Sequence, residues 1–373
     1  MECPFDLTNN RQVIDFDEVD PYNPQNRLKG YINRRQGHLY GTLYITHVND
    51  KECPQIIYSA PKQHYPFNTK DEWKFPEFDE VLVYDKLDGT CIISYTYHDD
   101  NGMTYLTYKT RLRPFLGHGE YGNFFSLWNE MRDKYPIDKL CMNLYFNFVF
   151  ELYGKRNKVL IDYDVPLDTR LLFLIGTNND LIYPPDGLAF VNDSNVPVVN
   201  GHKEDFTDLK TDYLHLQQQL EDELLIDEDN QLMKGREGVV MYFVKDGAVQ
   251  LKCKPPSVLK YHWAGDAIPY PSVYTTVYNA FENFDEPTTA DVIELLKEEY
   301  DIGLIEKSKK RIERALGKIL FDKKFQYQLA DDYRKHNFDI NKDKVTCMRW
   351  FGQHCPRSQA KKIFNLLKQY EDK

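Results

Sequence analysis

The 373-residue sequence predicts an α+β protein, with antiparallel sheets in its larger N-terminal part and an all-α C-terminal domain. Residues 81–254 consist mostly of short apolar runs separated by turn residues, which is typical of antiparallel strands. After about Tyr261, apolar residues recur at helical spacing instead. We therefore expect two domains, residues 1–263 and residues 264–373, joined by a linker with glycine and prolines at residues 264–271.

The predicted elements follow from periodicity and from turn residues. Hairpin turns are expected at residues 98–102 and at residues 245–247, where Asp and Gly separate apolar runs. Residues 206–226 carry leucines at helical spacing with an acidic opposite face, which predicts a surface helix. The predicted strands are residues 81–84, 92–97, 103–109, 144–152, 171–175, 239–244 and 248–253. The predicted C-terminal helices contain Val292, Leu295 and Leu296; Ile312, Leu316, Ile319 and Leu320; and Ile363, Leu366, Leu367 and Tyr370.

The composition indicates a globular protein of a reducing compartment. Hydrophobic residues make up 42% and aromatic residues 14% of the chain, which excludes a disordered protein. No apolar stretch approaches the roughly 20 residues of a membrane span, and residues 1–6 do not resemble a signal peptide. The 7 cysteines are scattered, and Cys347, His354 and Cys355 lack the spacing and the fourth ligand of a zinc site. We expect the cytoplasm or another reducing intracellular compartment, and no membrane partner.

Charge is distributed unevenly along the chain. The net charge of −11 argues against a general nucleic-acid coat. Residues 305–373, however, contain 18 Lys and Arg against 9 Asp and Glu, so the C-terminus is basic and the rest of the chain strongly acidic. Solvated helix faces and a surface that contacts nucleic-acid phosphates would explain this basic segment equally well.

A lysine-containing loop is the first candidate for chemistry. Lys86, Leu87, Asp88 and Gly89 lie between two predicted strands, and Gly89 allows a tight turn and close approach of a ligand. A lone Lys-x-Asp-Gly tetrapeptide is usually a solvated turn, so its value depends on partners elsewhere in the chain.

Three downstream residues fit a lysine nucleophile. A lysine amine attacks a phosphorus atom only in its uncharged form, which nearby cations or a metal ion favour. Lys252 and Lys254 are two residues apart on a predicted strand, so they share one face of the sheet and could lie beside Lys86 and triphosphate oxygens. Lysines at this spacing are also common on exposed strands. Glu237 precedes a buried strand, and a carboxylate that faces phosphate needs a divalent cation between them, so Glu237 is a candidate magnesium ligand.

Further polar residues end the neighbouring strands. Glu151 follows the aromatic run 145–150, where a buried carboxylate would need a donor such as a ribose hydroxyl. The alternative is a glutamate at a strand end that points to water. Thr110 and Arg111 end the hairpin that begins at the lysine loop, so Arg111 or Lys109 could contact phosphate or ribose there.

Together these residues resemble the covalent nucleotidyltransferase superfamily and, within it, the phage-type ATP-dependent RNA ligases. The family's five motifs occur in order at Lys86 to Gly89, Thr110 and Arg111, Phe150 and Glu151, residues 237–240, and residues 252–254. Residues 150–163 are similar to the pattern of the RNA-ligase branch, and residues 65–68 resemble its aromatic-Asn element. The resemblance covers about residues 60–255.

The resemblance implies a nucleotidyltransferase catalytic domain with ATP-grasp-like antiparallel sheets and a lysine-AMP intermediate. It implies ATP and Mg²⁺ (or Mn²⁺) as cofactors and RNA 5′-phosphate and 3′-hydroxyl ends as partners. Lys86, Asp88, Lys252 and Lys254 would be catalytic, and Glu237 would bind the metal. The nucleotide would contact Lys62, Lys86, Thr110, Arg111, Glu151, Phe173, Glu237, Lys252 and Lys254.

Some positions depart from the family pattern. Residues 59–62 replace the usual Arg-Gly, with Lys62 as a substitute, and Leu112 replaces a small residue after the second motif. Phe173 is the candidate for stacking on adenine, although it could simply be a core residue.

Three alternatives remain open. A DNA ligase or an mRNA-capping guanylyltransferase of the same superfamily would usually carry an OB-fold module after the fifth motif, where this sequence predicts helices. A non-catalytic RNA-binding module could keep the fold, but every charged residue that the chemistry requires is present. We expect the helical domain to bind the RNA substrate without taking part in adenylation, because all five motifs precede residue 264.

Overall fold

The computed structural model confirms the α+β class. Antiparallel sheets occupy the chain up to Cys253, and helices follow from Tyr270. The predicted linker at residues 264–271 lies mostly outside the described residues. The structure describes residues 2–8, 12–35, 37–68, 71–117, 123–157, 161–227, 232–257, 268, 270–297, 300, 302–356 and 359–371.

An N-terminal sheet that the sequence patterns did not predict precedes the lysine loop. Its four strands pair antiparallel in chain order: β1 (Val13–Val19), β2 (Arg27–Asn33), β3 (Leu43–Val48) and β4 (Lys51–Ile57). The inner face packs on Tyr95 and Tyr97 of the next sheet. The sheet therefore extends the core away from the lysine loop.

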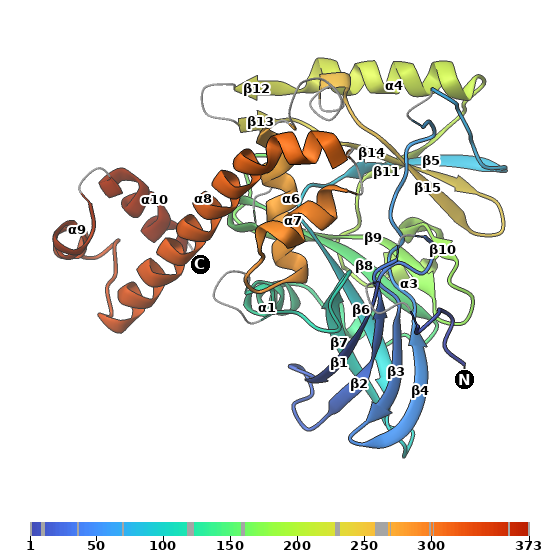
Figure 1. Ribbon diagram of the computed structural model, residues 1–373, viewed down its shortest axis with the longest axis horizontal. Helices are drawn as coiled ribbons and strands as arrows, with labels where there is room; N and C mark the ends of the chain where they lie inside the picture. Colours follow the sequence, from blue (N-terminus) through green and yellow to red (C-terminus); the bar gives the residue numbers. More distant parts are fainter. Residues whose placement is uncertain are drawn as a thin grey trace.

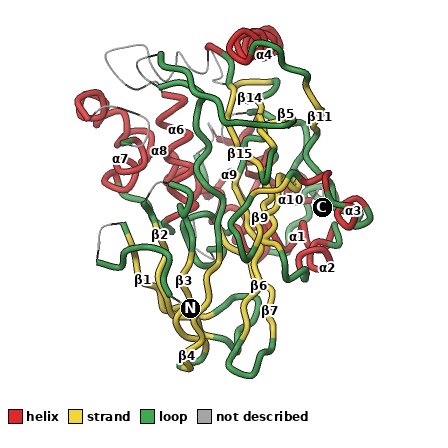
Figure 2. Tube along the Cα trace, turned by 90° about the vertical axis from the view of Figure 1, so that its right-hand side faces the viewer, coloured by secondary structure: helices red, strands yellow, loops and turns green. Residues whose placement is uncertain are grey.

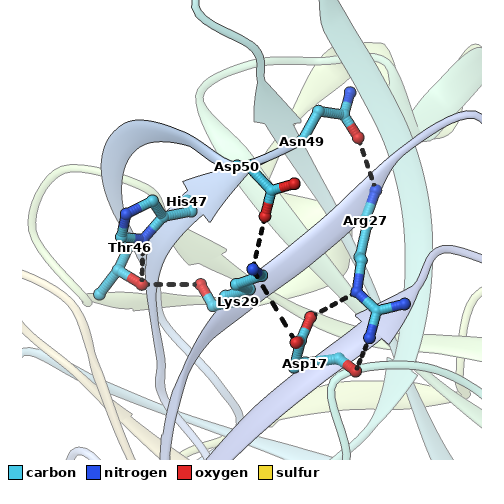
Figure 3. Close-up of polar contacts among 7 residues, drawn as sticks. All are labelled: Asp17, Arg27, Lys29, Thr46, His47, Asn49 and Asp50. Atoms are coloured by element: carbon cyan, nitrogen blue, oxygen red, sulfur yellow. Dashed lines mark hydrogen bonds and ion pairs between the residues drawn. The ribbon is translucent and has the colours of Figure 1, made fainter.

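The outer face of this sheet is polar and ion-paired, as Figure 3 shows. Arg27 Nε lies 2.6 Å from Asp17, and Lys29 Nζ lies 2.5 Å from Asp50, all with exposed side chains. Asn49 and Asp50 have positive φ angles of 52° and 62° and form the tight turn between β3 and β4. Exposed pairs of this kind contribute about 0–1 kcal/mol each, so this face is a solvated surface.

Two further sheets enclose the central core. The five-stranded sheet has the order β10-β9-β8-β6-β7, and the four-stranded sheet has the order β11-β5-β14-β15. Tyr84, Val149, Phe173 and Tyr242 belong to the apolar cluster between them. The strands are β5 (Glu80–Lys86), β6 (Thr90–His98), β7 (Thr104–Thr110), β8 (Phe146–Tyr153), β9 (Asp168–Gly176), β10 (Ile182–Tyr183), β11 (Gly201–Glu204), β14 (Gly238–Val244) and β15 (Ala248–Cys253).

Helices cover the outer faces of both sheets (Figure 2). Trp128 of α1 (Phe124–Lys134) is fully buried in a cluster that also contains residues of α2 (Ile137–Cys141) and of the five-stranded sheet. Tyr213 of α4 (Leu209–Glu223) packs on the sheet β11-β5-β14-β15. The remaining short elements are η1 (Lys155–Asn157), η2 (Pro185–Gly187), α3 (Ala189–Asn192), β12 (Leu225–Asp227) and β13 (Leu232–Lys234).

Helix α4 spans Leu209–Glu223, shorter than the predicted residues 206–226. Its N-cap is Asp208, whose carboxylate accepts hydrogen bonds from the amides of Lys210 and Thr211. At the other end Leu224 is extended and leads into β12, so pairing with β13 ends the helix early.

The helical region forms two small cores joined by one long helix. One core contains α6 (Tyr270–Asn283), α7 (Thr289–Leu296) and the start of α8 (Ile302–Lys335). The other contains the end of α8, α9 (Lys344–His354) and α10 (Ala360–Glu371). In Figure 1, α8 runs from the sheets to α9 and α10 at its far end. Within the described residues no helix is both long and apolar enough to cross a membrane.

The carboxylate of Asp168, at the start of β9, stabilises the five-stranded sheet through hydrogen bonds to three side chains. Its buried carboxylate accepts hydrogen bonds from Lys134, the last residue of α1, at 3.0 Å and from Tyr135, the next residue, at 2.7 Å. It also accepts one from Arg170 at 2.7 Å. Asp168→Ala leaves these donors without their acceptor, so we expect the free energy of unfolding in urea to fall by about 3 kcal/mol. Asp164→Ala, at an exposed carboxylate, should change it by less than about 0.5 kcal/mol. Equal losses in the two variants would contradict this role.

Candidate active site

A cavity of about 250 Å³ lies between the five-stranded sheet and the sheet β11-β5-β14-β15, and it is lined in part by α6. Of the nine residues predicted to contact a nucleotide, eight line it; Thr110 does not. The polar and aromatic residues of the cavity wall include Tyr40, Lys62, Lys86, Asp88, Arg111, Glu151, Phe173, Glu237, Lys252, Lys254, Ser272, Thr276, Asn279, Glu282 and Asn283, and Gly89 also lines it.

Lys86 and Lys254 meet on one buried carboxylate. Lys86 is the last residue of β5 and pairs in register with Gly238, which places it beside Glu237. Lys86 Nζ lies 2.6 Å from Glu237 Oε2, and Lys254 Nζ lies 2.7 Å from Oε1. Burial alone would raise the pKa of Glu237, but the ammonium groups of Lys254 and Lys86 outweigh it and lower the pKa to about 2. The carboxylate is therefore ionised and holds both lysines in place.

Lys252 and Lys62 add positive charge to the same wall. Lys252 is 8% exposed, and its Nζ lies 4.4 Å from the centroid of the Tyr65 ring. Burial lowers the pKa of His64, and the charges of Lys62 and Lys252 lower it further. Helix α4 fixes the backbone of this strand, because Tyr213 donates a hydrogen bond to the carbonyl of Lys252 at 3.1 Å. The wall is suited to bind phosphate oxygens.

Asp88 connects the lysine loop to residues 161–163, which follow η1, by two hydrogen bonds. Its amide donates to the hydroxyl of Tyr163 at 2.8 Å, and its Oδ2 accepts from the amide of Ile161 at 2.7 Å. These contacts support the predicted role in orienting the loop. Lys158 belongs to residues 150–163, the stretch similar to the RNA-ligase pattern, and it lies outside the described residues.

Gly89 has no room for a side chain. An added Cβ would lie 2.1 Å from the carbonyl oxygen of Leu152, on the neighbouring strand β8. Gly89→Ala must therefore displace the lysine loop, and a displacement of about 1 Å lowers a rate roughly hundredfold. We expect the transfer of AMP to the protein, which the resemblance implies, to fall by about that factor. Gly187→Ala, where an added Cβ has nothing within 4 Å, is the matched control and should keep wild-type transfer. Wild-type transfer by Gly89→Ala would contradict this requirement.

Glu151 is buried, not turned to water. It is 9% exposed, and its Oε1 accepts from the amide of Gly89 at 3.0 Å. Burial raises the pKa of Glu151 to about 8, with a contribution from the negative charges of Glu282 and Glu237 against the opposing charge of Lys86. A carboxyl group that is poorly solvated in a cavity beside the candidate nucleophile is able to bind a hydroxyl of a ligand.

The residues at the end of β7 have separate positions. Arg111 lines the cavity, and its buried Nε has no hydrogen-bond partner among the described residues. The hydroxyl of Thr110 instead donates to the carbonyl oxygen of Glu282 at 2.7 Å. Lys109 is fully buried outside the cavity, where its Nζ donates to the carbonyl oxygens of Gly41 and Arg111. Of Lys109 and Arg111, only Arg111 is placed to contact phosphate or ribose.

Phe173 is both a core residue and a residue of the cavity wall. The side chain is 2% exposed in the core between the sheets, and it also lines the cavity beside Tyr242, with ring centroids 6.4 Å apart. It is thus a core residue that forms part of the apolar end of the cavity wall.

A metal ion would need ligands from outside the protein. Among the described residues no group of three or more His, Cys, Asp or Glu side chains could hold a metal ion. Both oxygens of Glu237 are bound to lysines. The donor set fits a divalent cation only if nucleotide phosphates supply the other ligands, so the metal would arrive with the nucleotide.

Sequence reasoning missed the contribution of α6 to the cavity. Ser272, Thr276, Asn279, Glu282 and Asn283 line the wall from this helix, and Tyr40 lines it from the N-terminal part of the chain. The signal was present as a polar stripe at spacings of three and four residues in an otherwise apolar helix. Tyr40 had no such signal.

Comparison with known proteins finds distant structural likeness and no match in sequence. No protein-family model and no curated protein matches the chain. An archaeal ATP-dependent RNA ligase is 15% identical with a TM-score of 0.46, over 84% of this chain and 74% of that chain. A putative ATP-dependent DNA ligase from Aquifex aeolicus is 13% identical with a TM-score of 0.45, over 93% and 86%. A Naegleria gruberi RNA ligase with pyrophosphate is 14% identical with a TM-score of 0.36, over 56% and 65%.

The chain is thus structurally similar, at low identity, to ATP-dependent RNA ligases and to a putative DNA ligase. Identities of 13–16% and TM-scores below 0.5 carry no information about the substrate. The function has to be argued from the residues of the cavity.

Proposed function

We propose that the protein is an ATP-dependent RNA ligase that joins 5′-phosphate and 3′-hydroxyl ends through a lysine-AMP intermediate. The observation that carries the proposal is the convergence of Lys86 and Lys254 on buried Glu237, with Lys252 in the same cavity. A lysine at the end of a strand, in a cavity that also contains two further lysines, has the surroundings that nucleophilic attack on a triphosphate requires.

In the first step the uncharged amine of Lys86 attacks the α-phosphorus of ATP. A P–N bond forms, the bond from the α-phosphorus to the bridging oxygen breaks, and pyrophosphate leaves. Lys252 and Lys254 offset the negative charge that develops on the phosphate oxygens, with Lys254 nearest the α-phosphate. AMP then passes to an RNA 5′-phosphate, and an RNA 3′-hydroxyl displaces AMP as the phosphodiester forms. Asp88 holds the loop in position for these steps.

Glu237 has to release Lys86 before the attack. An ammonium group that donates to a carboxylate at 2.6 Å has no free electron pair, so Lys86 must leave Glu237 and lose a proton. Glu237 would then hold a divalent cation bound to the triphosphate, whose positive charge would replace that of Lys86. Glu151, beside the loop, binds a ribose hydroxyl, and Phe173 contacts the base.

The helices after β15 favour RNA as the substrate over DNA and over mRNA caps. The described residues from Tyr270 onward form helices, whereas DNA ligases and capping enzymes of the resembled superfamily usually carry an OB-fold there. The basic residues of the C-terminal segment 305–373 provide a surface suited to nucleic-acid phosphates. All 7 cysteines are free, five of them buried, which supports the cytoplasm or another reducing compartment.

The test is transfer of label from α-labelled nucleotides to the protein, followed by strand joining. We expect ATP with Mg²⁺ or Mn²⁺ to label the protein and GTP not to, and the labelled protein to join 5′-phosphorylated RNA. Labelling by GTP would indicate a capping guanylyltransferase. Joining of nicked DNA but not RNA would indicate a DNA ligase, and no labelling at all would indicate a non-catalytic RNA-binding module.

A further inference from the structure

Helix α6 has two faces with different partners. Val273, Val277, Ala280 and Phe281 are buried in the apolar core shared with α7 and α8. The polar stripe on the other face, defined by Ser272, Thr276, Asn279, Glu282 and Asn283, lines the cavity that contains Lys86. The helix thus joins the core of the C-terminal region directly to the candidate active site.

The C-terminal end of α6 makes three contacts with residues at or just after the ends of β2 and β7. The hydroxyl of Thr110 donates to the carbonyl of Glu282 at 2.7 Å. Arg113 lies 2.7 Å from Asp285, and the guanidinium of Arg34 lies 5.3 Å from the centroid of the Phe284 ring. Because all three contacts hold residues 282–285 or their immediate neighbours, the side chain of Glu282 is presented to the cavity from a fixed backbone.

Glu282 has surroundings that suit a ligand contact. Its carboxyl lies close to the side chain of Thr90, the residue after Gly89, and within electrostatic range of Arg111, Asp88 and Lys86. Burial raises its pKa to about 7, against the opposing charge of Arg111. Among the described residues, no ion pair engages Glu282 or Arg111. A poorly solvated carboxyl group in a cavity gains most from a hydrogen-bond donor on a ligand.

The chemistry of Glu282 limits the part of the ligand that it can bind. The cavity lining includes the lysines, which suit phosphate oxygens, and Phe173 and Tyr242, which suit an aromatic base. A carboxylate is repelled by phosphate, and an apolar ring edge has no hydrogen-bond donor for it. A ribose hydroxyl, in contrast, donates a hydrogen bond to a carboxylate. Glu151, which couples electrostatically to Glu282, lines the same cavity.

We propose that α6 is a wall of the nucleotide site and that Glu282 binds a ribose hydroxyl of the nucleoside triphosphate that modifies Lys86. The C-terminal region then takes part in adenylation itself, contrary to the expectation that it serves only the RNA substrate. This inference rests on the proposed nucleotidyl transfer, and its test separates the two.

The test measures adduct formation by the full-length protein with ATP, 2′-deoxy-ATP and 3′-deoxy-ATP. Glu151 is proposed to bind one ribose hydroxyl and Glu282 the other, so we expect the wild type to prefer ATP over each deoxy analogue by about tenfold, the effect of one hydrogen bond to a charged group. Glu282→Ala should raise the KM for ATP about tenfold and abolish the preference over one of the two analogues, while Glu282→Gln, which still accepts a hydrogen bond, should lose less. Glu286→Ala removes the same charge at an exposed position four residues later and should match the wild type.

Two results would overturn the proposed contact between Glu282 and a ribose hydroxyl. One is an unchanged KM and an unchanged preference in Glu282→Ala. The other is a loss of thermal stability in Glu282→Ala with the preference intact, which would mean that Glu282 only supports the fold. If the wild type forms no adduct with any nucleotide, the proposed function fails, and calorimetric binding of ATP decides the contact separately. Equal affinity of the wild type and Glu282→Ala for ATP would then reject it.

Discussion

Lys86→Ala should abolish the covalent AMP adduct and, with it, the joining of 5′-phosphorylated RNA. Lys254 is held by Glu237 and Lys252 faces the ring of Tyr65, so neither is placed to replace Lys86 at the end of the loop. Intact-mass spectrometry after incubation with ATP and Mg²⁺ measures the adduct directly. A persistent adduct with full yield would remove Lys86 from the role of nucleophile.

Lys86→Arg is the matched control for this prediction. A guanidinium keeps the positive charge next to Glu237 but is not deprotonated in proteins, so it cannot attack phosphorus. We expect Lys86→Arg to be as inactive as Lys86→Ala. Both variants should unfold within about 1 kcal/mol of the wild type, because the Lys86 side chain is 22% exposed and Glu237 keeps Lys254. A much larger loss of stability would point to a structural role for Lys86.

Glu237→Ala should combine a large loss of activity with a loss of stability. The change leaves the ammonium groups of Lys86 and Lys254, 22% and 12% exposed, without their shared carboxylate. We expect the free energy of unfolding to fall by about 3 kcal/mol, as when one partner of a buried ion pair is removed. Adduct formation should fall at least about hundredfold, because Lys86 is no longer positioned.

Magnesium dependence separates the two roles of Glu237. If the carboxylate also attracts the cation that accompanies the triphosphate, Glu237→Gln, which keeps the side-chain shape, should need a higher Mg²⁺ concentration for half-maximal labelling. An unchanged titration would exclude a contribution to cation binding. Glu223→Ala, which removes an exposed carboxylate paired with Arg236, is the control and should change neither activity nor stability appreciably.

The pH dependence of stability follows from the same carboxylate. The pKa of Glu237 is about 2 in the folded protein and near 4.5 when the group is free, so folding favours the ionised form. Its contribution to stability is therefore complete above about pH 4.5 and is lost as the pH falls toward 2. In Glu237→Gln this part of the acid destabilisation should be absent.

Local patterns predicted the elements that carry the site. Short apolar runs between turn residues indicated β5, β6, β7, β14 and β15 close to their observed bounds, and helical spacing indicated α7, α8 and α10. These patterns depend only on which side of one element faces apolar neighbours. The N-terminal sheet β1–β4 was not predicted, although its strands supply much of the core beside Tyr95 and Tyr97.

The sequence by itself determined the lysine loop, the order of the charged motifs and the change from strands to helices. Tertiary structure alone decided which charges meet: Lys86 and Glu237 are 151 residues apart, and Thr110 and Glu282 are 172 apart. It also decided that α6 belongs to the cavity and that Lys109 does not. The physical reason is that a residue's own element sets the direction of its side chain, whereas contacts between polar groups depend on how distant elements pack to bury their apolar faces.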